Sequence, residues 1–393
     1  MVQKPMIPPA KLAISWLTMF VIGTELFVVS PLLPLIGATY RIPPERVGLC
    51  VTAFAVVYVL SAPLLGLLSD RSGRRRVLTF CLVAFAAANL ATAFADDLPQ
   101  LIAARLFAGA AAAGISPSVY ALVGSAAPED RRATWLAFVV SGLLLSLVLG
   151  APLGAVAGAA IGWRHVFIVL AAVSLVLAWP NHRLWLRDRG VAAVTPSAAL
   201  KPTVLAMRVL PMVVWSTSLY GVYTYLGAGL SQIGFSASQI AQAILFYGCG
   251  AIVGVLIGGR AADRIGPKFM AGVSLLGLSG CFLLLRLALD AGTLFAPVLV
   301  LTSAVAQLFF PAQQAGLTTD FAARRATALA WNNSALFLGI SLGSISGAQA
   351  IAISGIDANL TVSAGIALIG CVLNSFIAPR PTRPLRRSAD RAG

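Results

Sequence analysis

Two charged residues lie inside long apolar runs of the sequence, where burial of an unpaired charge is energetically costly. Glu25 lies in the run 12–38 and is the only acidic residue deep in such a run. A buried carboxylate is costly if it stays charged, so we expect Glu25 to bind a proton, to be paired, or to face a water-filled cavity. Arg105 lies in the run 99–123, about six residues or roughly 9 Å from its start. It either has a functional role as a partner of Glu25 or extends its side chain to that end of the run.

A short connector combines glycines and charges at fixed spacing. The segment 66–77 has the sequence GLLSDRSGRRRV, which contains Gly66, Asp70, Arg71, Gly73 and Arg74. Its glycines permit a tight turn and a close approach of helices, and the carboxylate of Asp70 can accept hydrogen bonds or face the positive end of a helix. A basic connector that only orients the chain explains the arginines but not the Gly, Asp, Gly spacing. We therefore expect this segment to have a role beyond setting the orientation of the chain.

Small residues recur at every fourth position between 142 and 158. They are Gly142, Ser146, Gly150, Gly154 and Gly158. On a helix this spacing produces one face that is almost without side chains, so a second helix can approach closely. Pro152 in the same stretch predicts a kink. Helix packing alone explains this pattern as well as a functional role does. The same spacing recurs later in the chain at Gly343 and Gly347.

Uncharged polar residues in the apolar runs are candidates for ligand binding. This group consists of Asn332, Asn333, Gln307, Gln313 and Gln314, although hydrogen bonds between helices explain them equally well. The five cysteines lie in or beside apolar runs without the spacing of metal ligands, so we expect them to be packing residues. We expect neither a metal nor a cofactor, and the sequence has no nucleotide-binding loop or nucleophile motif that would indicate an enzyme.

The elements that hold these residues follow from composition. Of 393 residues, 59% are hydrophobic and only 10% are charged, whereas about a quarter of an average soluble domain is charged. A transmembrane helix needs about 20 predominantly apolar residues, and we find twelve such segments. They are 12–38, 47–68, 77–95, 99–123, 134–159, 164–186, 206–232, 239–261, 268–289, 294–318, 328–354 and 360–379. The sequence therefore predicts an all-α integral membrane protein with twelve transmembrane helices.

The basic residues predict the orientation of these helices. The net charge is +15, but the Lys and Arg residues are confined to connectors, so membrane topology and anionic lipid explain them and nucleic acid is not needed. Connectors on the side of both termini hold 23 of the 28 basic residues. The opposite side holds Arg41, Arg46, Arg164 and Arg286. We therefore expect both termini to be cytoplasmic in a multi-pass protein of the inner membrane.

The two halves of the sequence repeat each other at an offset of 193 residues. The first copy contains Gly66, Asp70, Arg71 and Gly73. The second copy contains, in the same order, Gly259, Asp263, Arg264 and Gly266. The repeat continues to Gly150 and Gly154, which match Gly343 and Gly347. We expect a six-helix bundle at 1–186, a cytoplasmic linker at 187–205, and a second bundle with a basic tail at 206–393.

These features together resemble the major facilitator superfamily of secondary transporters. The segment 66–77 resembles its signature connector between helices 2 and 3, and Arg105 is similar to an arginine of its helix 4 signature. The resemblance implies that Asp70 and Asp263 act in gating and that Arg105 acts in proton coupling. It also implies that Arg74 pairs with an acid before helix 5, here Glu129 or Asp130.

Within that superfamily the sequence is most similar to bacterial drug and sugar exporters. Helix 1, with Gly23, Thr24 and Glu25, resembles their start, and helix 5 resembles their antiporter signature without its adjacent Gly-Pro and Gly-Gly pairs. We therefore expect a monomeric, proton-coupled exporter of a small molecule. The alternatives are a proton-coupled importer of a sugar or metabolite, and a membrane sensor or enzyme that does not transport.

Overall fold

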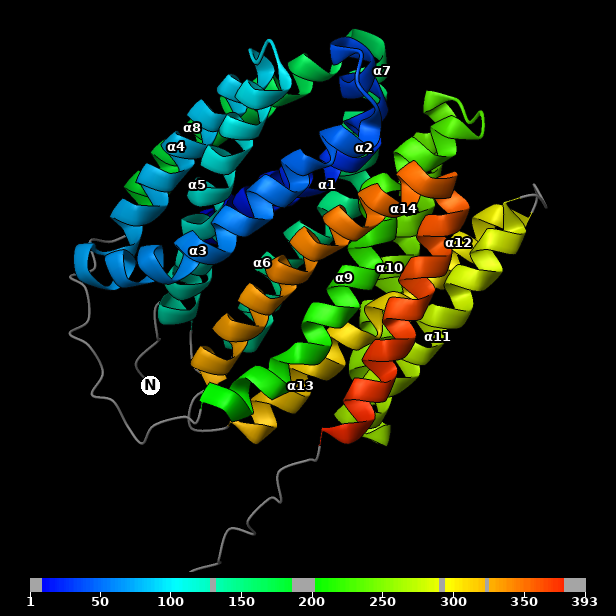
Figure 1. Ribbon diagram of the computed structural model, residues 1–393. Helices are drawn as coiled ribbons and strands as arrows, with labels where there is room; N and C mark the ends of the chain where they lie inside the picture. Colours follow the sequence, from blue (N-terminus) through cyan, green and yellow to red (C-terminus); the bar gives the residue numbers. More distant parts are fainter. Residues whose placement is uncertain (1–8, 128–131, 186–201, 290–293, 322–324, 378–393) are drawn as a thin grey trace, which may run out of the picture.

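The computed structural model describes residues 9–127, 132–185, 202–289, 294–321 and 325–377, and all the elements in these ranges are helical (Figure 1). The first part of the chain forms α1 to α8. These are α1 Pro9–Tyr40, α2 Pro44–Val47, α3 Leu49–Ser72, α4 Arg74–Ala93, α5 Leu98–Ala126, α6 Arg132–Leu145, the π-helical turn η1 Ser146–Gly150, α7 Ala151–Ile161 and α8 Trp163–Leu184. The second part forms α9 to α14. These are α9 Pro202–Gln232, α10 Ala237–Ile265, α11 Pro267–Ala288, α12 Phe295–Gln307, α13 Phe309–Asp320 and α14 Arg325–Phe376.

The described helices account for the twelve predicted spans. Eleven are long and apolar enough to cross a membrane, and the last of them, Ala328–Phe376, is 49 residues long. This stretch bends sharply, because Ser354 and Gly355 leave the helical conformation, with φ of −151° and 67°. It therefore contains two spans, and the prediction of twelve transmembrane helices is confirmed.

Three of the predicted spans are interrupted by a local change in the helix. A break at Gly48 separates α2 from α3, and one at Leu308 separates α12 from α13. The third interruption is η1, which directly precedes Ala151 and Pro152. A proline removes one N–H donor and its ring presses on the carbonyl four residues earlier, so a wider turn before Pro152 relieves the clash.

The internal repeat is present in the backbone as well as in the sequence. The described residues with positive φ form three pairs, and the two members of each pair are 193 positions apart. The pairs are Arg41 and Gly234, Gly73 and Gly266, and Gly162 and Gly355. Left-handed backbone is favourable chiefly for glycine and marks a change of chain direction. The two halves therefore turn at equivalent points, as two copies of one six-helix unit.

Helix ends are also held in the same way in both halves. Arg75 at the start of α4 donates to the carbonyls of His182 and Trp185 at the end of α8, at 3.2 Å each. Lys268 at the start of α11 donates to the carbonyl of Ser375 at the end of α14, at 3.0 Å. A cation at the C-terminal end of a helix satisfies carbonyls that lack partners and interacts favourably with the helix dipole.

We call the side on which α1 begins and α14 ends the termini side, and the opposite side the far side. Hydrogen bonds between the described parts of the halves join α1 and α2 to α9. Others join α3 and the far-side connector before it to α14. At the far side, the hydroxyl of Ser344 donates to the carbonyl of Gly48 at 2.8 Å. Toward the termini side the halves lean apart, and Figure 1 shows the end of α3, at the left edge, separated from the start of α14 below it.

Candidate functional site

The two charged residues of the apolar runs form an ion pair. Arg105 Nη1 on α5 donates to Glu25 Oε1 on α1, and the side chains are only 2% and 0% exposed. Arg105 therefore does not extend to the end of its helix, and that alternative is excluded. Among the described residues, Glu25 Oε2 and Arg105 Nε have no hydrogen-bond partner. One carboxylate oxygen of Glu25 is thus paired, while the other is buried without a donor.

An aromatic ring covers the ion pair on the side of α3. The guanidinium carbon of Arg105 lies 4.8 Å from the centroid of the Phe54 ring, a cation–π contact. The helices α3 and α5 are close at this level, because a Cβ at Gly109 would lie 2.3 Å from the carbonyl oxygen of Phe54. The glycine thus allows the contact that sets Phe54 beside Arg105.

Part of the predicted gate lies outside the described residues. Asp70 and Arg71 are in the last turn of α3, but their side chains are not among those described, and neither is any part of Asp130. Gly73, with φ of 92°, forms the turn into α4, where Arg74 donates to the carbonyl of Ala121 at 3.5 Å. The pairing of Arg74 with Glu129 or Asp130 stays a prediction.

The second copy of the gate is better described. Asp263 and Arg264 lie exposed in the last turn of α10, and Gly266, with φ of 94°, forms the turn that follows. The expected close helix approach is absent at the first glycine of each copy, since a Cβ at Gly66 or Gly259 would meet no atom of the described side chains and backbone within 4 Å. That expectation is wrong for this conformation, because the halves lean apart on the termini side.

The small-residue faces pack on neighbouring helices of their own half. A Cβ at Gly150 would lie 2.1 Å from Thr24 Oγ1, and one at Gly154 would lie 2.3 Å from Val28, both on α1. In the second half, Cβ atoms at Gly343 and Gly347 would lie 2.6 Å from carbonyl oxygens of α9. The faces thus bring α1 and α9 close to their partners, as small residues do in membrane helices.

The predicted substrate residues have three different surroundings. Asn332 is buried in the second half, where its side-chain oxygen accepts from Gln313 Nε2 at 3.3 Å. Asn333 instead faces the first half and donates to the hydroxyl of Tyr58 at 3.5 Å. Gln307 is the last residue of α12, before the break at Leu308. The structure does not bring the three together at one site.

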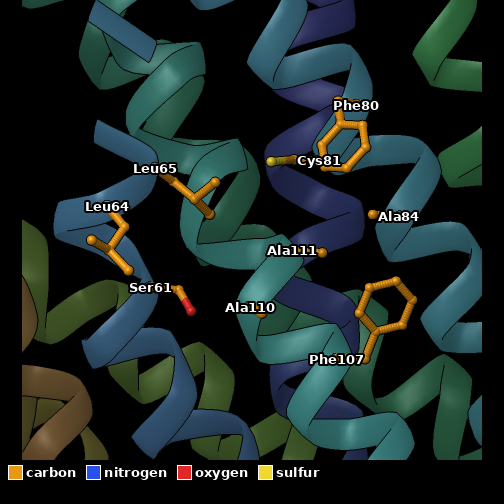
Figure 2. Close-up of a pocket in the computed structure, with 9 residues that line it drawn as sticks. All are labelled: Ser61, Leu64, Leu65, Phe80, Cys81, Ala84, Phe107, Ala110 and Ala111. Atoms are coloured by element: carbon orange, nitrogen blue, oxygen red, sulfur yellow. The ribbon is translucent and has the colours of Figure 1, made fainter. Parts of the chain in front are cut away.

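Two pockets lie away from the ion pair. Figure 2 shows the first, about 220 Å³ in volume, between α3, α4 and α5, where Phe80 and Phe107 flank a mostly apolar wall that includes Ser61. The second, about 230 Å³, lies at the termini side of the second half and contains the ion pair of Arg208 and Asp320. Gln313, one of the predicted substrate residues, lines the second pocket, whereas Asn332, Asn333 and Gln307 line neither.

Sequence reasoning missed the aromatic side chains where the two halves meet. Tyr58 of α3 and Phe337 of α14 are stacked, with ring centroids 3.7 Å apart and planes 17° apart. Tyr223 of α9 donates from its hydroxyl to the carbonyl of Phe27 at 3.1 Å, while Ser30 donates to the carbonyl of Tyr223. The one available signal was the spacing of four between Phe54 and Tyr58, which places both rings on one helix face.

Comparison with known proteins identifies the family. The model of the Major Facilitator Superfamily matches residues 15–232 and 209–393, which is nearly the whole chain. The fold agrees, since the crystal structure of a bacterial homologue of the human lysosomal transporter Spinster, inward-facing and unoccupied, superposes with a TM-score of 0.79 at 16% identity. The alignment covers 95% of this chain and 98% of that one. The chain belongs to the Major Facilitator Superfamily and is a multi-pass membrane transporter rather than an enzyme.

Three curated bacterial relatives are similar over much of their length. The uncharacterised MFS-type transporter YceJ of Bacillus subtilis is 28% identical over 83% of this chain and 85% of its own. A chloramphenicol resistance protein of Streptomyces lividans is 28% identical over 63% of this chain and 66% of its own. A probable sugar efflux transporter of Helicobacter pylori is 28% identical over 65% of this chain and 66% of its own.

Proposed function

We propose that this transporter is a proton-driven exporter of small molecules that works by alternating access. The observation that carries the proposal is the ion pair of Glu25 and Arg105, which is buried inside the first half. Export is supported by relatives that are named for chloramphenicol resistance and for sugar efflux. The substrate is therefore a drug, a sugar or a similar metabolite, and the second substrate is the proton.

Proton binding changes the electrostatic balance of the pair. A proton on Glu25 Oε2, which has no donor among the described residues, removes the negative charge and leaves Arg105 as a buried cation without a counter-ion. Loss of one partner of a buried ion pair costs about 3–5 kcal/mol. A differential of about 5.5 kcal/mol would move a two-state equilibrium from 1:99 to 99:1. Protonation of Glu25 therefore supplies somewhat less than a complete shift needs, but enough to move most of the population toward a second conformation, in which Arg105 gains water or a new partner.

The orientation follows from the basic connectors. With 23 of 28 basic residues on the termini side, that side is cytoplasmic in the bacterial inner membrane, where anionic lipid surrounds it. The conformation described here, with the halves leaning apart on that side, is then the inward-facing one. In the outward-facing state the monomer closes on the cytoplasmic side, where Asp70 and Asp263 hold the halves together.

The gate assignment predicts the effect of a substitution at Gly66. Gly66→Leu is expected to leave the melting temperature unchanged, because a Cβ at this position meets no atom of the described part of the chain. Transport should fall by about tenfold or more, since a leucine of that size would obstruct closure of the cytoplasmic side at a cost above about 1.4 kcal/mol. Gly280→Leu is the matched control, because a Cβ at that exposed position also meets nothing. Equal transport by the two variants would contradict the gate.

Inside-out membrane vesicles with an imposed pH gradient test the proposed function. Sugars, amphiphilic drugs including chloramphenicol, and nucleosides should each be screened for accumulation when the lumen is acidic. A proton-driven exporter accumulates its substrate in such vesicles, whereas a proton-coupled importer expels preloaded substrate. Movement that ignores the pH gradient would contradict proton coupling, and no movement of any compound would exclude the screened compounds as substrates.

A further inference from the structure

A continuous set of side chains connects the ion pair with the opposite half of the protein. It begins at Arg105, whose guanidinium lies over the ring of Phe54 on α3. Phe54 is stacked against Tyr58, one helical turn further along α3, with ring centroids 6.3 Å apart. Both rings then contact Phe337 on α14, with centroid distances of 6.5 Å from Phe54 and 3.7 Å from Tyr58. Glu25 is thus connected to Phe337 of the second half by three successive contacts, through Arg105 and Phe54.

A polar contact accompanies the rings at the same level. Asn333, one turn before Phe337 on α14, donates to the hydroxyl of Tyr58 at 3.5 Å. Two residues one turn apart on α3 therefore meet two residues one turn apart on α14. Phe54, Tyr58 and Phe337 are 3%, 3% and 7% exposed, so these contacts are formed between side chains that are almost fully enclosed.

The backbone at this level transmits displacement instead of absorbing it. The close approach of α5 to α3 at Gly109 leaves no room for a side chain between Arg105's helix and Phe54. Close-packed helices are not continuously deformable, so a shift of Arg105 is passed on to α3. Further along α3, toward the termini side, no described hydrogen bond or ring contact joins it to the second half. The rings are therefore the last such contact between α3 and α14 toward the termini side, beyond the hydrogen bond of Ser344 to Gly48 at the far side.

The charged and ionisable groups near Glu25 restrict how a proton can act. Among the described residues of the helices packed on α1, Arg105 is the charged side chain that contacts Glu25. Ionisable hydroxyls on neighbouring parts of the structure include those of Tyr58, one turn beyond Phe54, and of Tyr223, which donates to the carbonyl of Phe27. A change of charge at Glu25 is thus exerted on Arg105 first.

We propose that Phe54, Tyr58 and Phe337 are positioning residues that transmit the protonation state of Glu25, through Arg105, to the packing between the two halves. The proposal rests on the proposed function, because it assumes that Glu25 binds the transported proton. Release of Arg105 by a neutral Glu25 shifts the guanidinium from the Phe54 ring. The Tyr58–Phe337 stack then loosens, and the two halves can change their relative tilt.

Distance measurements by double electron–electron resonance test the proposal without a known substrate. Spin labels are attached to Arg76→Cys on α4 and Ile265→Cys on α10, two exposed positions on the termini side, after replacement of the five native cysteines. In liposomes, the parent should shift between a long and a short distance as pH changes, and Glu25→Gln should remain at one distance. Phe337→Leu should reduce the pH-induced change in the population ratio by about threefold or more, while Phe337→Tyr, which keeps the ring, should retain it.

A matched substitution separates transmission from general loss of packing. Phe309→Leu removes a ring that is 0% exposed and stacked on Trp215 at 5.1 Å, but both residues belong to the second half. It should leave the pH response intact. A full response in Phe337→Leu would overturn the transmitting role alone. An equal loss in Phe309→Leu would also overturn it, and the absence of any pH response in the parent would instead contradict the proposed function and, with it, this inference.

Discussion

Glu25→Gln is expected to abolish substrate accumulation driven by a pH gradient. Glutamine keeps the shape of the side chain and can still accept from Arg105, but it has the charge of the protonated acid at every pH. The charge beside Arg105 can then no longer change with pH. The free-energy difference of about 3–5 kcal/mol between a paired and an unpaired buried Arg105 is therefore no longer available to drive the conformational change. That differential corresponds to more than about a hundredfold change in an equilibrium constant, so accumulation should fall to the passive level.

The measurement is uptake into inside-out vesicles across a pH gradient, with the substrate found in the screen. Binding of that substrate should survive in Glu25→Gln, and its pH dependence should flatten because the titrating group is gone. Glu25→Asp should retain part of the activity, and Glu45→Gln in the far-side connector is the matched control. Full gradient-driven accumulation by Glu25→Gln would exclude this carboxylate as the obligatory proton site.

Gly150→Leu is expected to lower both stability and transport. Its Cβ would lie 2.1 Å from Thr24 Oγ1, and the remaining leucine atoms would enter the contact between η1 and α1. Overpacking of this kind costs typically about 1–3 kcal/mol and occasionally more, because α1 must move to accept it. We expect a lower melting temperature and loss of transport, since α1 also carries Glu25.

Melting in detergent and transport in vesicles should be measured for the same preparations. Gly280→Leu serves as the control, because that glycine has no neighbour within 4 Å of its Cβ and replacement of a helical glycine removes a source of flexibility. It should melt at or above the temperature of the parent. A melting temperature of Gly150→Leu equal to that of Gly280→Leu would show that this face has room for a large side chain.

Much of the fold is determined by short stretches of sequence. The twelve spans follow from runs of apolar residues long enough to cross a bilayer, and each run carries this information without its neighbours. The connectors at Gly73 and Gly266 are equally local, because the glycine itself allows the left-handed turn. The repeat at an offset of 193 residues is a property of the sequence, and it made the two-bundle architecture predictable before any helix was placed.

Only the tertiary structure decided which side chains meet. Arg105 pairs with Glu25, which is 80 positions away in the sequence. The adjacent Asn332 and Asn333 have different partners, because Asn332 is hydrogen-bonded within the second half and Asn333 is hydrogen-bonded to Tyr58 of the first half. Gly66 faces open space although its spacing suggested a close helix approach. The physical reason is that lipid tails are as apolar as the helix interfaces, so hydrophobicity specifies that a helix spans the membrane but not which of its faces contacts another helix.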